Sequence, residues 1–344
     1  MKTDLITLTS KGFYCEVGDF YIDPWQPVKR AVITHAHADH FVRGCDSYLV
    51  VDEGRHIFQI RLGDEAKIET LAYGASTLIN NVKISLHPAG HILGSAQIRV
   101  EYQGEVWVVS GDYKTASDQR TCTPFEPVPC HVFITEATFA LPIYSWKSQD
   151  SIFADLNAWW RNNVEQERAS IVYAYALGKA QRVMAGLDRD IGRIFTHGAV
   201  ERITQGYRDT GIDLPDTKYV TTHVEEVDKA DWRGSLIIAP LSARGTAWMK
   251  KFGNYSTASV SGWMQIRGAR RRRSVDRGFI LSDHADWAGL MSAIEATGAE
   301  RIGVTHGYIA SFVRWLQEKG YDARGYDTRY VGEDDNSDTD ENEA

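Results

Sequence analysis

Short apolar runs that end in turn residues are typical of the chain up to about residue 140. Phe20–Ile22 precedes an Asp-Pro turn, and Ala31–Ile33 precedes a cluster of histidines. Further along, Gln97–Tyr102 and Glu105–Val109 flank a Gln-Gly pair in the manner of a hairpin. Runs of this length between turn residues predict β-strands. We therefore expect a β-rich amino-terminal part with its polar residues gathered at strand ends.

The pattern changes near Ile152 to longer amphipathic stretches separated by single apolar runs. The alternation of predicted helices and buried strands is typical of a parallel α/β layer. The end of the chain continues with a strand, a helix, a strand and a helix. In chain order the predicted segments are 152–166, 171–176, 179–187, 199–207, 236–240, 278–282, 287–296, 301–305 and 309–318. The fold class that follows is α/β.

Composition places the chain among ordinary globular proteins. Its 344 residues can bury a sizeable core and favour two domains over one. With 43% hydrophobic and 24% charged residues, it contains no window that approaches the apolar length of a membrane span. Met1–Ser10 shows no export signal, and the four cysteines are scattered without a CxxC pair. We expect a cytoplasmic protein with reduced thiols and no membrane partner.

The net charge of −8 depends on where the acids lie. Seven acids and no base fall between Glu333 and Glu343, so this tail accounts for seven of the eight excess negative charges. The tail, residues 332–344, has too little apolar surface to offset ordering entropy and is expected to be disordered. The remaining body is close to neutral, and local basic patches on it could still bind phosphates.

Three histidines and an aspartate fall within six positions directly after an apolar strand. They are His35, His37, Asp39 and His40. In a loop that leaves a strand, side chains at this HxHxDH spacing can converge on one point. Imidazole and carboxylate are the ligands that zinc and similar divalent ions prefer, and histidines buried without partners would be costly. The cluster therefore predicts a metal site.

Two ions need more ligands than this cluster offers, and candidates occur at later strand ends. His91 lies in a glycine-flanked turn, Asp112 follows Ser-Gly, and His306 follows the last core strand. Glycine beside such a residue lets the backbone approach closely. Two ions about 3.5–4 Å apart that share a carboxylate clamp the attacking hydroxide and a phosphoryl oxygen. The same clamp hydrolyses lactams and thioesters, so the metals alone do not choose the substrate.

The order, spacing and flanking residues of these motifs resemble the β-CASP branch of the metallo-β-lactamase superfamily. Within it they most resemble the bacterial DNA-ligase-associated DNA exonucleases, over roughly residues 10 to 330. The resemblance implies a metallo-β-lactamase αββα sandwich from residues 1–144 and 276–331, with an inserted α/β β-CASP domain at 145–275. It also implies a set of ligand roles. One ion would be held by His35, His37 and His91, the other by Asp39, His40 and His306, with Asp112 bridging them and Asp23 bracing the metal loop.

The resemblance further implies the catalytic roles. A hydroxide between the ions would be the nucleophile, and His284, held by Glu136, would be the general acid that protonates the leaving oxygen. An imidazolium oriented by a carboxylate suits this task, because an alkoxide is a poor leaving group near neutral pH. Asp283 and Asp286 flank His284 and are alternative orienting groups. The catalytic candidates are Asp39, Asp112, Glu136 and His284, and the cofactors are two divalent ions, Zn²⁺ or alternatively Mn²⁺.

Two basic segments are candidates for substrate binding. Lys179 is expected to open a helix after a glycine, where exposed N–H groups and its charge favour phosphate, although an ordinary strand-to-helix turn would look the same. The densest positive run could line a substrate groove and make binding salt-dependent, or could be a solvated face or a partner of the tail. It consists of Arg270, Arg271, Arg272 and Arg273, reinforced by Arg267 and Arg277.

The resemblance implies a DNA phosphodiesterase, an exonuclease of DNA repair in functional association with a DNA ligase. One residue favours another substrate. In the family that the chain resembles, a histidine at the position of His306 is associated with RNA-cutting members, whereas Artemis-like DNA-cutting members carry valine. An RNase of the same family and a small-molecule metallo-hydrolase are therefore alternatives. A non-catalytic nucleic-acid-binding subunit is disfavoured, because every expected ligand is present.

Overall fold

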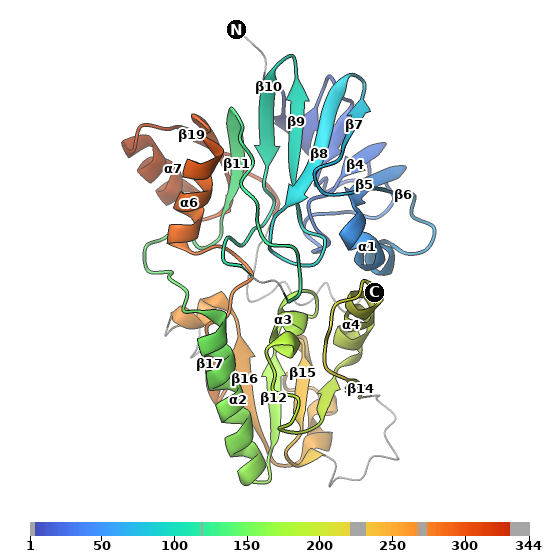
Figure 1. The fold of residues 1–344 in the computed structure, drawn as a ribbon, viewed down its shortest axis with the longest axis vertical. Helices are drawn as coiled ribbons and strands as arrows, with labels where there is room; N and C mark the ends of the chain where they lie inside the picture. The colour runs from blue at the N-terminus through green and yellow to red at the C-terminus, as the bar shows by residue number, and fades with distance from the viewer. Residues whose placement is uncertain (1–3, 118–119, 221–231, 267, 269–273, 331–344) are drawn as a thin grey trace. The chain divides into compact units, whose positions relative to one another are not determined.

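The computed structural model describes residues 4–117, 120–220, 232–266, 268 and 274–330. These residues form two compact units (Figure 1). The first unit comprises the described parts of Met1–Ser145 and His284–Ser337, and the second comprises those of Trp146–Asp283. Each unit is an α/β structure with its own sheets and core. The α/β class predicted from the sequence is confirmed.

The first unit contains a six-stranded sheet whose order follows the chain. Its first three strands are antiparallel neighbours, and from β3 onward each strand is parallel to the next. The strands are β1 (Thr7–Thr9), β2 (Gly12–Cys15), β3 (Phe20–Ile22), β4 (Arg30–Val32), β5 (Ser47–Val51) and β6 (Ile68–Leu71). Between β5 and β6 lie η1 (Asp52–Gly54) and the helix α1 (Arg55–Leu62).

A second sheet of the first unit has seven strands in the order β19-β18-β11-β10-β9-β8-β7. The half made of β7 to β10 is antiparallel, and β10, β11, β18 and β19 are parallel. The predicted hairpin is confirmed, since β9 and β10 pair across Gln103-Gly104. The strands are β7 (Ser76–Ile79), β8 (Val82–Pro88), β9 (Ala96–Tyr102), β10 (Glu105–Val109), β11 (Val132–Ala137), β18 (Arg301–Gly307) and β19 (Asp322–Gly325).

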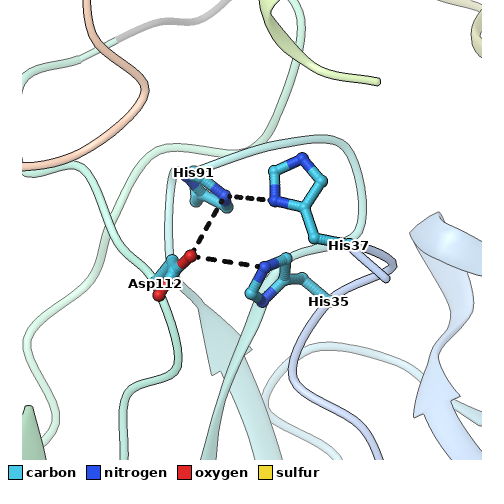
Figure 2. A group of neighbouring side chains, drawn as sticks. All are labelled: His35, His37, His91 and Asp112. Carbon is cyan, nitrogen blue, oxygen red and sulfur yellow. Dashed lines mark hydrogen bonds and ion pairs between the residues drawn. The ribbon is translucent and has the colours of Figure 1, made fainter. Parts of the chain in front are cut away.

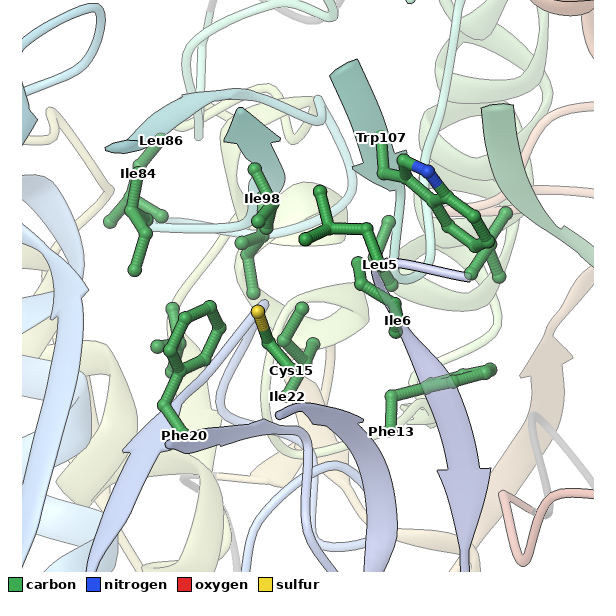
Figure 3. Close-up of a cluster of buried hydrophobic side chains, with 14 of the residues drawn as sticks. Leu5, Ile6, Phe13, Cys15, Phe20, Ile22, Ile84, Leu86, Ile98 and Trp107 are labelled. Atoms are coloured by element: carbon green, nitrogen blue, oxygen red, sulfur yellow. The ribbon is translucent and has the colours of Figure 1, made fainter. Parts of the chain in front are cut away.

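One hydrophobic core lies between the two sheets. Phe13, Phe20 and Ile22 of the first sheet face Ile98 and Trp107 of the second (Figure 3). The side chains on a strand alternate between its two faces, so the neighbours of the core residues on the second sheet point the other way. They pack against the helices α6 (Trp287–Thr297) and α7 (Ile309–Glu318) in a second core. Helix, sheet and sheet thus stack in layers, which is compatible with an α/β sandwich.

The second unit is built on a six-stranded sheet that is parallel throughout, in the order β14-β13-β15-β12-β16-β17. Its strands are β12 (Ala169–Tyr173), β13 (Ile194–Thr196), β14 (Thr217–Tyr219), β15 (Leu236–Ala239), β16 (Tyr255–Val260) and β17 (Arg277–Phe279). Its helices are α2 (Gln149–Glu165), α3 (Lys179–Ala185) and α4 (Gly198–Asp209), with the 3₁₀ turns η3 (Leu241–Ala243), η4 (Ala247–Phe252) and η5 (Gly262–Gln265). The predicted alternation of helices and strands in a parallel layer is confirmed here.

One strand joins a different sheet from the one expected. The run at 278–282 was assigned to the final part of the first domain, but β17 pairs with β16 in the sheet of the second unit. The chain accordingly returns to the first unit at His284. A short apolar run predicts a strand without specifying its partner, because pairing is settled by tertiary contacts. Among the described residues, no helix is long and apolar enough to cross a membrane.

Candidate metal centre

The residues of the predicted metal site come together at the ends of strands in the first unit. His35, His37, Asp39 and His40 follow β4, His91 follows β8, Asp112 follows β10, and His306 lies near the end of β18. Every predicted ligand except His37 and Asp39 is buried, and those two are partly exposed. The sequence-predicted ligand set is therefore one cluster in space.

Asp112 lies at the middle of this cluster, and its two carboxylate oxygens face different histidines. Oδ2 is 3.5 Å from Nε2 of His35 and 3.7 Å from Nε2 of His91. Nε2 of His91 is in turn 3.1 Å from Nδ1 of His37. Figure 2 shows the three imidazoles and the carboxylate pointing toward one another. These four side chains form the first group.

The other oxygen of Asp112 faces a second group. Oδ1 is 3.0 Å from Nε2 of His306 and 3.6 Å from Nε2 of His40. Asp39 borders this group, with its Oδ2 at 3.8 Å from Nε2 of His40. Asp112 is thus shared by both groups, as a bridging carboxylate would be.

Asp23 braces the histidine loop from behind. Its Oδ1 accepts a hydrogen bond from the backbone N–H of Thr34 at 2.7 Å, and its Oδ2 accepts one from the Thr34 hydroxyl at 2.5 Å. Nδ1 of His40 donates to the same Oδ2 at 2.8 Å, which turns Nε2 of the ring toward Asp112. Burial by itself lowers the pKa of His40, but the carboxylates of Asp39, Asp112 and Asp23 raise this pKa to about 10.

Several buried polar atoms of the cluster form no hydrogen bond. Their chemistry and position show whether the residues fit a metal ion. Among the described residues, Nε2 of His35, His40 and His306 and Oδ1 of Asp112 make no hydrogen bond of acceptable geometry, although Nε2 of His306 lies 3.0 Å from Oδ1 of Asp112. Buried polar atoms are normally bonded, because leaving them unpaired is costly. Here they converge within a few ångströms, and all of them are atoms that coordinate divalent ions. The residues present fit metal binding.

His284 and Glu136 form a third group that also includes Asp112. Nδ1 of His284 lies 3.0 and 2.8 Å from the two carboxylate oxygens of Glu136, although 148 positions separate the two residues. Glu136 also accepts the backbone N–H of Tyr113 at 2.8 Å, and both partners are almost completely buried. Of the orienting groups considered from the sequence, Glu136 is the one with a described bond to the ring. Asp286 instead accepts the backbone N–H of Gly289 at 2.9 Å and caps α6.

Glycines permit the close approach of backbone segments in this site. Gly111 has φ of +57°, and a Cβ at this position would lie 2.6 Å from the Thr34 side chain. Gly307 has φ of +92°, and a Cβ at this position would clash with the backbone of Ala137. Residues that carry a side chain rarely adopt such φ values. These turns therefore require glycine beside Asp112 and His306.

The structure does not place the residues predicted to bind substrate in this cluster. Arg270, Arg271, Arg272 and Arg273 lie outside the described residues, as does the acidic tail. The role predicted for Lys179 needs correction. Its side chain is completely buried, and Nζ pairs with Oδ2 of Asp283 at 3.0 Å instead of facing solvent. Sequence alone missed this, because a lysine at a helix start gives no sign of a carboxylate about a hundred positions away.

Two residues that support the site were not predicted from the sequence. The ring of Tyr330 stacks on His40, with centroids 4.4 Å apart, and its hydroxyl donates to the carbonyl of Asp23 at 3.0 Å. Glu53 accepts the backbone N–H of Gly94 at 3.3 Å and the hydroxyl of Thr123 at 2.6 Å, which ties the turn after His91 to η1. No pattern around Tyr330 or Glu53 signals these contacts, since both depend on segments distant in sequence.

The fold and the cluster together define the class of the protein: a mixed α/β protein with a histidine and aspartate site that can bind metal ions. No protein-family profile matches the chain. The chain is 30% identical over 318 residues to a "Probable DNA ligase" of Opitutus terrae, which covers 91% of this chain and 30% of that protein. It is 28% identical over 123 residues to endoribonuclease YSH1 of Eremothecium gossypii, covering 36% of the chain and 16% of that protein.

A second YSH1 relative, from Saccharomyces cerevisiae, is 28% identical over 138 residues, or 40% of the chain and 18% of that protein. The chain thus spans less than a third of the length of these relatives. Since YSH1 is a β-CASP metallo-β-lactamase protein, the resemblance of the chain to this branch is confirmed. A crystal structure of a protein of unknown function from Enterococcus faecalis has the same general fold, with a TM-score of 0.58 at 11% identity over 88% of this chain and 80% of that one.

Proposed function

We propose that the chain is a metal-dependent phosphodiesterase that hydrolyses nucleic acid. The observation that carries the proposal is Asp112, whose two oxygens face two separate groups of histidines. We assign the first unit to a metallo-β-lactamase αββα sandwich and the second to an inserted β-CASP domain. The two facing sheets, the second of which is covered by α6 and α7, support the former assignment, and the parallel α/β layer supports the latter.

The proposed ligands follow from the two groups. His35, His37 and His91 would hold one divalent ion, and Asp39, His40 and His306 the other, with Asp112 shared between them. Two such ions neutralise the phosphodiester and lower the pKa of the attacking water. The imidazole-rich ligand set favours Zn²⁺, with Mn²⁺ as the alternative because carboxylates take part. Asp23 fixes the tautomer of His40 through Nδ1, as outer partners of metal ligands commonly do.

His284 is the proposed general acid. Glu136 accepts a hydrogen bond from Nδ1 of the ring, which leaves Nε2 as the atom that would carry and release the proton. When the P–O bond breaks, its electron pair stays on the leaving oxygen, and the proton from Nε2 neutralises that oxygen as an alcohol. The ring also lies beside His91, with centroids 4.6 Å apart, which places the donor next to the first ligand group.

DNA is the proposed substrate, cut from an end in the course of repair. The Opitutus relative supports this choice, because the similarity covers nearly the whole of this chain and lies within a longer protein described as a DNA ligase. A nuclease that trims ends prepares substrates for a ligase, so we also propose a functional association with a DNA ligase.

RNA is a second candidate substrate, and a specific observation favours it. The YSH1 relatives are endoribonucleases, and His306 takes part in the second ligand group. The similarity to YSH1 covers a smaller share of the chain than the similarity to the ligase, and we therefore rank RNA second.

The test is digestion of end-labelled single-stranded DNA and RNA of the same sequence with added zinc or manganese. Asp112→Ala should abolish cleavage, whereas Asp46→Ala, which removes an exposed carboxylate of the same unit, should not. Stepwise loss of DNA nucleotides supports the exonuclease and shows its polarity. Preferential cutting of RNA transfers the assignment to an RNase. Cutting of neither, together with turnover of a chromogenic lactam, would favour a small-molecule hydrolase instead.

A further inference from the structure

Lys179 and Arg182 form a buried ionic network with Asp283 that the proposed chemistry does not use directly. Nζ of Lys179 lies 3.0 Å from Oδ2 of Asp283, and Nε of Arg182 lies 2.6 Å from Oδ1. All three side chains are at most 2% exposed. Burying such charges is expensive, and a buried ion pair is weak evidence for stability, so its use often lies in fixing one conformation.

The network ties together the two points at which the chain enters and leaves the second unit. Nη1 of Arg182 bonds to Oε1 of Gln149 at 3.1 Å, and Gln149 is the first residue of α2, three positions after the chain enters this unit. Asp283 is the residue at which the chain leaves it. One short helix, α3, thereby holds both ends of the segment.

The turn that carries these cations is itself fixed. Gly178 has φ of +91°, and its N–H donates to Oε1 of Gln181 at 2.8 Å. Nε2 of Gln181 donates to the carbonyl of Ala176 at 3.0 Å. The glycine, lysine, glutamine and arginine of this motif are thus all used to hold α3 and Asp283 in place. The motif is accounted for without a phosphate.

The residue after Asp283 is His284, the proposed proton donor. Its ring is bonded to Glu136 in the first unit, while the preceding side chain is bonded to two cations in the second. The two anchored side chains thus belong to neighbouring residues, joined by one peptide bond. A proton donor must lie within hydrogen-bond reach of the leaving oxygen, so small shifts in its backbone cost rate.

We infer that Lys179 and Arg182 are positioning residues that set the placement of His284 through Asp283. This inference rests on the proposed function, and it assigns the basic motif to proton delivery instead of phosphate binding. It predicts that damage to the network slows only those reactions that need a proton on the leaving oxygen.

The test compares two substrates for Lys179→Met. A labelled oligonucleotide has an alkoxide leaving group that needs a proton, whereas bis(p-nitrophenyl) phosphate releases a stable phenolate that does not. We expect kcat on the oligonucleotide to fall about 10- to 100-fold, part of the contribution of a general acid, with less than about a twofold change on the activated diester. Lys179→Arg, which keeps the charge, should restore most of the oligonucleotide rate.

Arg161→Met is the matched control, because it removes an exposed ion pair with Asp188 in the same unit and should change neither rate. Parallel loss on both substrates, or no loss on either, would overturn the inference. If Lys179→Met does not fold, Arg182→Lys replaces it, since lysine keeps the charge but cannot hold Asp283 and Gln149 together. A wild-type protein that cleaves neither substrate would overturn the proposed function and, with it, this inference.

Discussion

Asp23 offers a sharp test of how the site holds metal, through the substitution Asp23→Asn. Asparagine has the same shape and tolerates the φ of +44° at this position. Its amide can offer only one accepting oxygen, whereas the carboxylate accepts the Thr34 N–H, the Thr34 hydroxyl and Nδ1–H of His40. An NH₂ group placed against either N–H donor would repel it. The tautomer of His40 would then no longer be fixed.

Loss of such an outer partner lowers metal affinity by about 10- to 100-fold, or about 1.4–2.8 kcal/mol. A second effect concerns protons. Before an ion binds, the surrounding carboxylates outweigh burial and raise the pKa of His40 to about 10, so at neutral pH its ring is charged. A metal requires the neutral ring, and binding must therefore release this proton and weaken as the pH falls. Asp23→Asn removes one of the carboxylates that raise the pKa of His40. Fewer protons should therefore be released for each ion that binds.

Isothermal titration with zinc, in two buffers of different ionisation enthalpy, measures both affinity and proton release. Asp19→Asn is the matched control, because Asp19 also has a positive φ, of +51°, but is exposed and lies outside the cluster. Unchanged affinity and unchanged proton release in Asp23→Asn would refute the reasoning that Asp23 holds His40 in its metal-binding form.

Three further outcomes are expected. Asp112→Ala should reduce bound metal measured by atomic absorption, as well as cleavage, because both ligand groups lose their shared carboxylate; full metal content would contradict the bridging role. His284→Ala should slow oligonucleotide cleavage by roughly 100- to 10,000-fold while metal content stays at the wild-type level, and Glu136→Gln should have a smaller effect in the same direction. Gly111→Ala should lower the free energy of unfolding by about 1–3 kcal/mol in urea denaturation, since its Cβ would meet Thr34 in a left-handed turn; an unchanged midpoint would show that the turn relaxes.

The local sequence pattern determined several helices and most of the candidate metal ligands. The elements near 152–166, 287–296 and 309–318 appear as helices with nearly the expected bounds, because amphipathic period is a property of a few consecutive turns. The HxHxDH loop likewise contains its own ligands within six positions. His91, Asp112 and His306 could be proposed because each follows a strand beside a glycine, and the structure brings them to the same cluster.

Tertiary structure alone decided the rest. The bond of His284 to Glu136 joins residues 148 positions apart, and the burial of Lys179 on Asp283 turned a predicted phosphate contact into an internal ion pair. The sequence also did not predict which sheet β17 joins or that Tyr330 stacks on His40. Spacing along the chain reports which neighbours can share a face, but charge pairing and burial depend on segments that meet only when the chain folds.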